Sequence, residues 1–305
     1  MILVCGEALI DLAQTAEAGV WRAHPAGSPL NVAVGLARLG CPTAFLGRLS
    51  RDVFGRQLQA RLADNDVDLR CVVDAAEATS LAIVDVDDEG VASYVFHMSG
   101  TADWQWSPDE LPGLDGVTAV HTGSLALLQA PGGAVLESWL AGCRGRVPVS
   151  IDPNIRPSVQ GDRDVYRAAV ERWLALSDVF KASREDVAFL YPGEPVEAVA
   201  QRWLHAGPQL VAITLGPDGA HLATAAGTAD IPGQAVRVVD TVGAGDAFTS
   251  GLLQHLHASG LLTTTALAEI ELQQATAAVA FAVRVAADTC TRAGAEPPHR
   301  NTLDT

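Results

Sequence analysis

The stretch of this sequence that carries the most chemical information reads Asp240-Thr241-Val242-Gly243-Ala244-Gly245-Asp246. An apolar segment that ends at Val239 comes before it, and a helical pattern over residues 247–257 follows it. The order therefore predicts a strand, a glycine turn and the first turn of a helix. Glycines permit a sharp turn. The unpaired N–H groups and the dipole of a helix start form a site for an anion such as phosphate.

Asp246 is unexpected at such a site because its negative charge would repel phosphate. One interpretation is that Asp246 takes a proton from a hydroxyl group that attacks phosphorus. Phosphoryl transfer to an alcohol needs this pairing of a base with an anion site. The other interpretation is that Asp246 only caps the helix and that the glycines only serve the turn. The sequence pattern by itself leaves both interpretations open.

The longer string Asp-Thr-x-Gly-Ala-Gly-Asp resembles the C-terminal signature of the ribokinase-like (PfkB) family of sugar kinases. The resemblance implies that Asp246 is the catalytic base and that Gly243, Ala244 and Gly245 form the anion hole. It extends over nearly the whole chain, so we expect a single ribokinase-like domain over residues 1–305. The expected fold is a three-layer αβα arrangement with a mainly parallel central sheet, and the alternation of strand and helix patterns agrees with it.

The N-terminal region contains candidate sugar-binding residues. Asp11 follows an apolar run, where the carboxyl end of a strand presents ligand groups in an α/β sheet. A helix pattern with Ser28 as its N-cap comes next, and Asn31 lies in its first turn. This region resembles the family's Gly-Gly pair followed by Asn, with Ala26 in place of the first glycine. The resemblance implies that Asp11, Gly27 and Asn31 bind the sugar.

Residues 80–86 and 91–97 are two strand-like runs joined by Asp87-Asp88-Glu89-Gly90, which is a hairpin signal. We expect this hairpin to belong to a small β lid formed by about residues 12–24 and 70–98. A lid that excludes water is useful to a kinase, because water competes with the sugar as acceptor. The alternative is a surface hairpin without function. The lid is also a candidate surface for a homodimer.

Two further strings resemble the fructokinase branch of the family, namely Ala102-Asp103 and Asp152-Pro153-Asn154-Ile155-Arg156. The second string is also similar to one in 2-keto-3-deoxygluconate kinases. The resemblance implies that Asp103, Asn154 and Arg156 contact the sugar. A turn aspartate and a surface arginine are the alternatives from composition alone, since Pro153 must end the strand before it.

The C-terminal half is expected to bind ATP and metal ions. The resemblance assigns ATP contacts to Ser183, Thr214, Gly216, Gly219, Gly243, Gly245 and Val283, the last on an alanine-rich helix expected over residues 268–286. Asp186 stands where the family has a Glu that holds magnesium through water. Asp240, the Val242 carbonyl and Gly294 match the loops that hold a monovalent cation, K⁺, in some members.

Composition limits the remaining classes of protein. The chain has 305 residues, 49% of them hydrophobic, which suits one large α/β domain. A formal net charge of −16 argues against partners such as nucleic acids or anionic membranes. Five scattered cysteines without metal spacing are typical of reduced thiols in a cytoplasmic protein. No signal peptide and no apolar run near the ~18 residues of a membrane span are apparent.

The sequence therefore predicts an ATP-dependent, magnesium-requiring sugar kinase that converts D-fructose to fructose 6-phosphate. The main alternative is a 2-keto-3-deoxygluconate kinase with the same fold and mechanism. A nucleoside kinase fits less well, since Asp103 and the Asp152–Arg156 string resemble the fructokinase branch. From another class, a catalytically silent sugar or nucleotide binder would lack a use for Asp246. A dinucleotide dehydrogenase is disfavoured, because the turn after the first strand lacks Gly-x-Gly-x-x-Gly.

Overall fold

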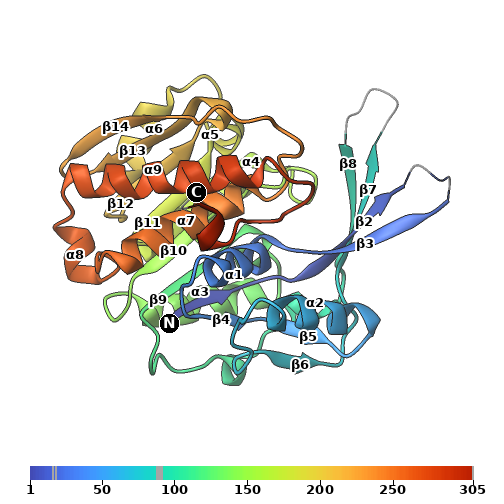
Figure 1. The fold of residues 1–305 in the computed structure, drawn as a ribbon. Coiled ribbons are helices and arrows are strands. Elements are labelled where there is room, and N and C mark those ends of the chain that lie inside the picture. The colour runs from blue at the N-terminus through green and yellow to red at the C-terminus, as the bar shows by residue number, and fades with distance from the viewer. Residues whose placement is uncertain (16, 18, 87–91, 304–305) are drawn as a thin grey trace.

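A central eight-stranded sheet organises this computed structural model, which describes residues 1–15, 17, 19–86 and 92–303 (Figure 1). The strand order is β14-β13-β12-β11-β10-β9-β1-β4. The strands from β12 to β4 in this order are parallel, whereas β13 and β14 are antiparallel to their neighbours. The strands are β1 (Ile2–Cys5), β4 (Thr43–Leu46), β9 (Ala119–Gly123), β10 (Val149–Asp152), β11 (Val179–Ser183), β12 (Leu210–Thr214), β13 (Gly219–Thr224) and β14 (Gly227–Pro232).

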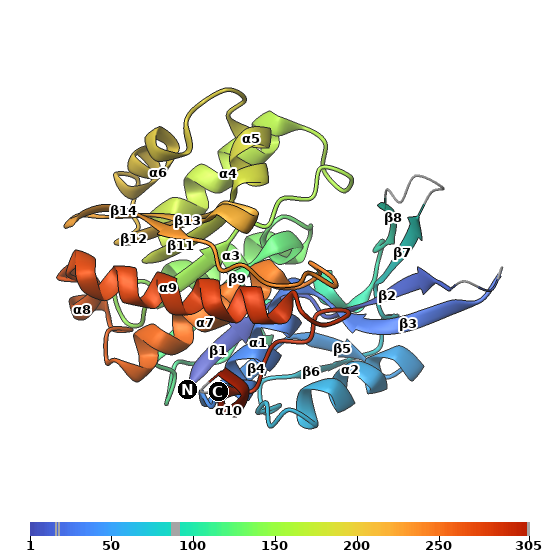
Figure 2. The ribbon, with the colours of Figure 1, turned by 45° about the horizontal axis from the view of Figure 1, so that its top comes forward.

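Helices cover both faces of this sheet (Figure 2). One face carries α1 (Ser28–Arg38), α7 (Ala244–Ala258) and α9 (Leu272–Thr289), and the other carries α3 (Gly132–Cys143), α4 (Arg163–Leu176) and α6 (Val196–Leu204). The strands are apolar on both sides because both sides are buried. In β1, for example, Ile2 and Val4 join the first core, while Leu3 and Cys5 join the second. The predicted three-layer fold with a mainly parallel sheet is confirmed.

The remaining helices are short or lie at the edges of the sheet. They are α2 (Val53–Ala63), α5 (Arg184–Leu190), α8 (Thr264–Ala268), α10 (Arg300–Leu303) and the 3-10 turns η1 (Ala102–Trp104), η2 (Pro108–Glu110), η3 (Ser124–Leu127) and η4 (Gly216–Asp218). In the part of the chain that the structure describes, no helix combines the length and the apolar character that crossing a bilayer requires.

Close packing between α1 and α7 fixes the position of the first turn of α7. Gly35 of α1 faces Ser250 of α7, and a Cβ atom on Gly35 would lie 2.4 Å from the Ser250 hydroxyl oxygen. Only glycine therefore permits this approach of the two helices. As a consequence, the first turn of α1 and the first turn of α7 lie next to each other, where Ser28 and Asn31 reach Asp246.

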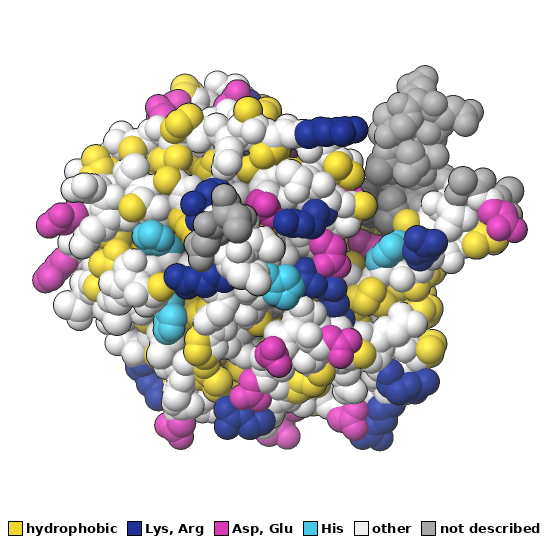
Figure 3. Space-filling model, in the orientation of Figure 1, with side chains coloured by type: hydrophobic (Ala, Val, Ile, Leu, Met, Phe, Trp, Pro, Cys, Tyr) yellow, Lys and Arg dark blue, Asp and Glu magenta, His cyan; other side chains and the backbone are white. Residues whose placement is uncertain are grey.

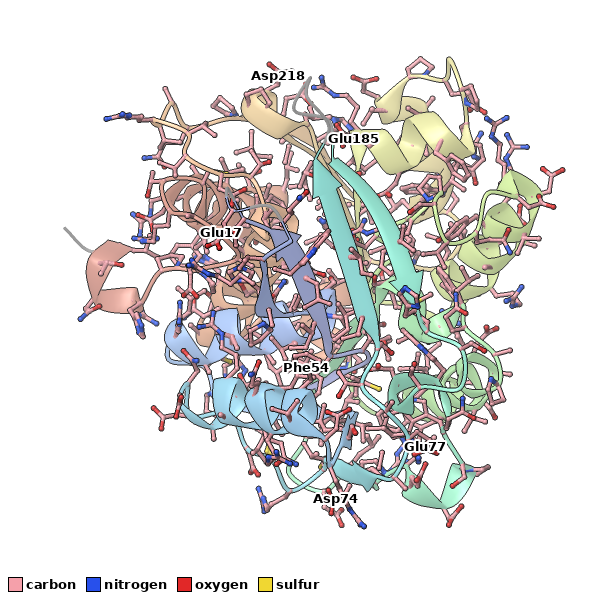
Figure 4. The ribbon with its side chains drawn as sticks, turned by 90° about the vertical axis from the view of Figure 1, so that its right-hand side faces the viewer. Glu17, Phe54, Asp74, Glu77, Glu185 and Asp218 are labelled. Atoms are coloured by element: carbon pink, nitrogen blue, oxygen red, sulfur yellow. The ribbon has the colours of Figure 1, made fainter. Side chains whose placement is uncertain are left out.

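A second, four-stranded sheet projects from the body at the right of Figure 1. Its order is β3-β2-β7-β8, with β2 parallel to β7 and the outer pairs antiparallel. Seen from its own side, this sheet stands in front of the body (Figure 4). Its strands are β2 (Leu9–Gln14), β3 (Trp21–Ala26), β7 (Leu81–Val86) and β8 (Ala92–His97). A separate two-stranded sheet consists of β5 (Arg48–Ser50) and β6 (Val73–Ala75).

The predicted hairpin corresponds to β7 and β8, which pair antiparallel from Leu81 opposite His97 to Val86 opposite Ala92. The predicted turn over residues 87–90 lies outside the described residues. The predicted lid range also included residues 70–80, but there the structure differs. Val73–Ala75 forms β6, which pairs with β5 next to α2 and not with the second sheet.

One sequence expectation in the C-terminal third is wrong, and another differs from the structure in its boundaries. The apolar segment before Asp240 is irregular and not a strand, and Val238 and Val239 are 60% and 58% exposed. This segment pairs with no strand among the described residues, and its Val239 N–H donates to the Cys290 carbonyl oxygen at 2.8 Å. The alanine-rich helix expected over residues 268–286 corresponds to α9, which begins at Leu272, where Glu271 and Gln274 form a capping box, and ends at Thr289.

Candidate active site

A cavity of about 1180 Å³ lies where the second sheet meets the body, at the carboxyl ends of the parallel strands and the start of α7. Basic and acidic side chains both stand beside this junction on the face drawn in Figure 3. The cavity brings together most sugar, anion and cation residues that the sequence predicts, namely Asp11, Gly27, Asn31, Asn154, Arg156, Asp240, Val242, Gly243, Gly245, Asp246 and Gly294. Parallel strands end at one edge of a sheet, which explains why distant segments meet there.

Asp246 is held at the cavity wall by two side chains of α1. The Ser28 hydroxyl donates to Oδ1 at 2.6 Å, and the Asn31 amide donates to Oδ2 at 2.8 Å. The N-cap of α7 is Gly243, in a left-handed conformation, so Asp246 is not a capping residue. Ser28 was expected as the N-cap of α1, but Gly27 occupies that position and Ser28 orients Asp246 instead. The capping interpretation of Asp246 is therefore wrong.

Burial raises the pKa of Asp246, while the hydrogen bonds from Ser28 and Asn31 and the charge of Lys181 oppose this rise. Only 8% of the residue is exposed. A partly desolvated carboxylate with a raised pKa is a better proton acceptor than a fully solvated one. The geometry and the environment of Asp246 both suit a general base.

The turn before Asp246 has the features of an anion site. Gly243 has a φ of +76°, and a Cβ atom there would lie 2.6 Å from the Cβ of Ala295. Within the described residues, no acceptor takes the N–H groups of Gly243 and Gly245, so both are free to meet an anion. The N–H of Ala244 differs from the sequence expectation, because it donates to the Thr241 carbonyl oxygen at 3.2 Å. The two glycines thus supply the free donors of the predicted anion hole.

The side of the cavity where the sequence predicts sugar binding contains Asp11 on β2 and the loop after β10. Burial raises the pKa of Asp11 to about 6, with the positive charge of Arg156 acting against this rise. Arg156 itself donates to the Asn154 side-chain oxygen at 2.7 Å, so the two predicted residues form one unit. Gly27 has a φ of +114°, and a Cβ atom there would lie 2.6 Å from the Glu7 carbonyl oxygen. Glycine is therefore needed for the turn into α1.

Asp103 lies behind the cavity and does not line it. Its carboxylate accepts the N–H of Ala8 at 2.8 Å and the hydroxyl of Ser80, and it is 2% exposed. Burial raises its pKa to about 6. Asp103 thus holds the segment after β1 in place, so the structure gives it a supporting position where the sequence predicted a sugar contact.

Glu7 was missed by the sequence reasoning although it lines the cavity. Its Oε2 accepts the N–H of Ala126 at 3.2 Å. Burial raises the pKa of Glu7 to about 7, so its carboxyl group exchanges a proton near neutral pH. A signal was present in the sequence, since an acidic residue directly after a buried strand is placed at the ligand edge of an α/β sheet.

Of the residues predicted to bind ATP, Gly243 and Gly245 line this cavity, and the other five lie outside it. Ser183 caps α5 and Thr214 ends β12, where its hydroxyl donates to the Ala182 carbonyl oxygen at 3.4 Å. Arg184 donates to Asp218 at 2.7 Å, and Glu185 and Asp218 lie at the same end of the body in Figure 4. A Cβ atom on Gly216 would meet open space, whereas a Cβ atom on Gly219 would lie 2.0 Å from the Ile231 carbonyl oxygen of β14, so position 219 requires glycine. Val283 is buried in α9.

Comparison with known proteins decides the family. The sequence model of the pfkB family carbohydrate kinases matches residues 1–302. The chain belongs to this family. A fructokinase of Rhizobium leguminosarum bv. trifolii is 36% identical over 278 residues, which are 90% of this chain and 85% of that protein. A fructokinase of Klebsiella pneumoniae is 36% identical over 263 residues, 85% of each chain.

Solved structures of pfkB kinases and their relatives share the fold. A fructokinase double mutant of Vibrio cholerae O395 with bound fructose, ADP and potassium superposes with a TM-score of 0.86 at 31% identity, over 99% of this chain and 96% of that one. A fructokinase of Xylella fastidiosa with bound ATP gives 0.89 at 28% identity, over 99% and 97%. An aminoimidazole riboside kinase from Salmonella enterica gives 0.83 at 28% identity, over 99% and 98%.

Asp186, the predicted magnesium ligand of this pfkB kinase, is already hydrogen-bonded within the protein. Asp186 accepts the N–H of Ile155 on Oδ1 and both the N–H and the hydroxyl of Ser183 on Oδ2. All three distances are 2.8 Å, so this carboxylate holds two loops together and does not reach the cavity. In the described ranges, no three His, Cys, Asp or Glu side chains are grouped so as to hold a metal ion. Magnesium would therefore be held mainly by phosphate oxygens and water, as is usual for this ion.

Asp240 joins the two loops that were predicted to hold a monovalent cation. Its Oδ1 accepts the N–H of Val242 at 3.0 Å, and its Oδ2 accepts the N–H of Gly294 at 2.7 Å. Both loops contribute to the cavity wall beside Gly243. Asp240 thus fixes the anion turn relative to residues 293–296, and its direct contact with a cation stays a prediction.

Proposed function

We propose that this pfkB-family kinase transfers the γ-phosphoryl group of ATP to the primary hydroxyl of D-fructose, which yields ADP and fructose 6-phosphate. The position of Asp246 carries the proposal, because its carboxylate is buried beside two free glycine N–H groups at the wall of a cavity that Asp11 and Arg156 also line. Relatives named fructokinase at 36% identity, and one with fructose and ADP bound at 31%, support it.

The reaction follows from these residues. Asp246 accepts the proton of the primary hydroxyl as the sugar oxygen forms its bond to the γ-phosphorus and the bond from phosphorus to the leaving ADP oxygen breaks. The N–H groups of Gly243 and Gly245 donate to the phosphoryl oxygens, where negative charge concentrates. Ser28 and Asn31 keep Asp246 in one orientation. Magnesium, when bound with ATP, neutralises charge on the phosphate oxygens.

We also infer that the second sheet is the lid of this site. Leu9, Asp11 and Ala13 of β2 and His24 of β3 line the cavity, so a movement of this sheet would change access to the sugar. A closed sheet would exclude water, which competes with the sugar for the phosphoryl group. A homodimer through this sheet and a cytoplasmic location stay predictions.

The substrate prediction is that fructose gives the highest kcat/KM in a coupled ADP-release screen. The screen would compare fructose, 2-keto-3-deoxygluconate, ribose, tagatose and adenosine. Fructose is expected because Arg156 and Asn154 form one polar unit on the sugar side, next to Asp11. A tenfold preference for ketodeoxygluconate would select the alternative kinase. The absence of turnover with every acceptor would favour the catalytically silent binder.

Substitution of the two sugar-side residues is expected to separate binding from catalysis. Asp11→Ala should raise the fructose KM by roughly 10–100-fold, the equivalent of one lost hydrogen bond to a charged group, with little change in kcat. Asn31→Ala should also lower kcat, because Asn31 donates to Asp246. Gln57→Ala, in the outer part of the same cavity, is the matched control and should change neither. An unchanged fructose KM in Asp11→Ala would remove Asp11 from the sugar site.

Activity is expected to rise when potassium chloride replaces tetramethylammonium chloride at equal ionic strength. The reason is the position of Asp240, which ties the anion turn to Gly294 through two hydrogen bonds. A cation between these loops would hold the turn in place and add positive potential near the phosphates. The measurement is the initial rate in each salt, and equal rates would contradict the prediction.

A further inference from the structure

Lys181 forms a buried ion pair next to the proposed phosphoryl-transfer site. It lies on β11, and its Nζ donates to Asp152 Oδ2 on the neighbouring strand β10 at 2.7 Å. The side chains of Lys181 and Asp152 are 5% and 1% exposed. The other oxygen of Asp152 accepts the N–H of Asn154 at 3.1 Å, so the pair is connected to the sugar-side loop.

Lys181 is also distinguished by composition. The chain contains 20 lysine and arginine residues, of which Lys181 is the one lysine and the other 19 are arginine. Arginine thus supplies the positive charge everywhere else in this chain. A lysine ammonium is a compact point charge, whereas a guanidinium is wide and planar, so the two are not interchangeable at a buried position.

Stability does not explain why this pair is present. Transfer of two charges from water to the protein interior is unfavourable, and well-packed apolar residues of similar volume are often equally or more stable in the same place. Asp152 is the last residue of β10, and the Lys181 ammonium group, which comes from the middle of β11, meets it there beside Gly245 of α7. Its position therefore points to a use of the charge at the site.

The anion turn approaches the lysine directly. A Cβ atom on Gly245 would lie 3.0 Å from Lys181 Nζ, so no side chain separates the ammonium group from the backbone of Gly245. Gly245 lines the cavity, and its N–H is one of the two free donors of the turn. Among the described residues, only Asp152 accepts a hydrogen bond from Nζ. The ammonium group therefore has donors left without an acceptor among the described residues, and it lies next to the backbone of Gly245.

The charges around the turn would be unfavourable for phosphate without this lysine. Asp152 and Asp186 interact electrostatically with Lys181, as does Asp246. Burial lowers the pKa of His121 in the same cluster to about 4, so this histidine is neutral at pH 7. Burial alone would lower the pKa of Lys181, but the carboxylates, Asp152 foremost, raise it, and the ammonium stays charged. Lys181 is thus the cation of the cluster formed by residues 121, 152, 181, 186 and 246.

We propose that Lys181, fixed by Asp152, is an electrostatic positioning residue for phosphoryl transfer, which supplies positive charge to the anion turn from behind Gly245 and counterbalances the carboxylates around Asp246. The proposal rests on the proposed kinase function, since it assigns a role within that reaction. It also explains why residue 245 is a glycine. A side chain there would separate the ammonium group from the turn and from a bound phosphoryl group.

A pair of variants separates this role from simple neutralisation of Asp152. Lys181→Met removes the positive charge and leaves Asp152 unpaired. An unpaired buried charge destabilises the fold. The kinetics of Lys181→Met are therefore interpreted only together with those of the double variant. The double variant Asp152→Asn/Lys181→Met removes both charges, and the amide oxygen that it places at position 152 can still accept the N–H of Asn154. We expect the double variant to unfold at a temperature close to that of the parent, with kcat lowered by ~10²–10³, the range for loss of one preorganised electrostatic contact in a site.

The pH profile gives a second readout that a purely structural role would not change. Asp246 is faced by Ser28 and Asn31 from α1, by Asp152 from β10 and by Lys181 from β11. Lys181 lowers the pKa of Asp246 and Asp152 raises it. Removal of the lysine in Lys181→Met should therefore move the acidic limb of the kcat/KM profile to higher pH, and the double variant should show a smaller shift.

The single lysine also permits a measurement without turnover. Protein grown with lysine labelled with ¹⁵N at Nζ should give one side-chain signal, that of Lys181. We expect this signal to shift when fructose and the non-hydrolysable analogue AMP-PNP are added together, and to stay unchanged with fructose alone.

Two results would overturn the role of Lys181 while the kinase function stands. One is a double variant that turns over within threefold of the parent, and the other is a lysine signal that does not respond to AMP-PNP and fructose. A parent protein without turnover on any sugar of the screen is a different outcome. It would refute the proposed function and the role of Lys181 together.

Discussion

Replacement of Asp246 by Asn is expected to lower kcat by ~10²–10⁴, the usual range for loss of a positioned general base. An Asn side chain has the same shape, so its oxygen can accept the Asn31 amide and its NH₂ group can donate to the Ser28 hydroxyl. The contacts that orient residue 246 should therefore persist. What is lost is the ability to accept the hydroxyl proton, so the effect should fall on kcat and not on the Kd of fructose or ATP.

The stability of Asp246→Asn provides the internal check. Because burial raises the pKa of Asp246, its ionised form is less favourable in the folded protein than in the unfolded chain, and this unfavourable contribution appears as the pH rises through the acidic range. A neutral Asn avoids it, so the variant should unfold at the same temperature as the parent or slightly above it at pH 7. Steady-state kinetics and thermal unfolding on the same preparation measure both effects.

Asp64→Asn is the matched control for this experiment, because Asp64 lies at the outer part of the same cavity. It removes the same charge from the same cavity, away from α7, and should leave kcat unchanged. If Asp246→Asn folds like the parent and turns over within threefold of it, Asp246 is not the base. A general effect of cavity charge would instead appear as an equal loss in both variants.

The anion turn and its helix could be predicted from the sequence because their causes are local. Gly243 adopts a positive φ and starts α7, and both properties are determined by a short stretch with glycines at fixed positions. The meeting of Asp11, Asn31 and Asp246 could also be predicted, since strand ends and helix starts of a parallel sheet collect at one edge. These features depend on topology and not on the details of packing.

The partners within the site could not be predicted, because they depend on tertiary packing. Ser28 reaches Asp246 across 218 positions of sequence, and only the close approach of α1 and α7 brings the two together. By its local pattern, Ser28 is an ordinary N-cap candidate. Lys181 is similar, because an alternating strand pattern places it on one face of the sheet but does not show that Asp152 and Gly245 meet it there.

The wrong strand before Asp240 shows a limit of hydropathy. Val238 and Val239 are apolar and β-branched, which is typical of strands, yet they are exposed in an irregular segment. A strand needs a neighbouring strand to pair with, and this segment pairs with none among the described residues. The main-chain N–H of Val239 instead donates to the Cys290 carbonyl oxygen at 2.8 Å. This contact brings the turn to the loop after α9, where Asp240 then binds Gly294.

That loop makes Gly243→Ala the second substitution from which we expect a large effect. Residue 243 has a φ of +76°, which costs a non-glycine residue about 1–2 kcal/mol. In addition, the new Cβ would lie 2.6 Å from the Cβ and 2.9 Å from the Cα of Ala295. The loop cannot yield easily, because the neighbouring Glu296 is paired with Arg38 at 2.6 Å and with Arg61 at 2.8 Å. The turn must therefore move instead.

A displaced turn no longer aims the N–H groups of Gly243 and Gly245 at the phosphoryl oxygens. We expect kcat to fall by ~10²–10³, the range for loss of one anion-hole donor, together with a lower unfolding temperature.

Gly116→Ala separates backbone strain from the clash, because Gly116 has a φ of +74° and nothing lies within 4 Å of its Cβ position. This control should lose about 1–2 kcal/mol of stability and keep the kcat of the parent. The double variant Gly243→Ala/Ala295→Gly should recover part of the lost activity, since it removes the closer of the two contacts. A Gly243→Ala variant with the kcat of the parent would show that the position of this turn does not limit phosphoryl transfer.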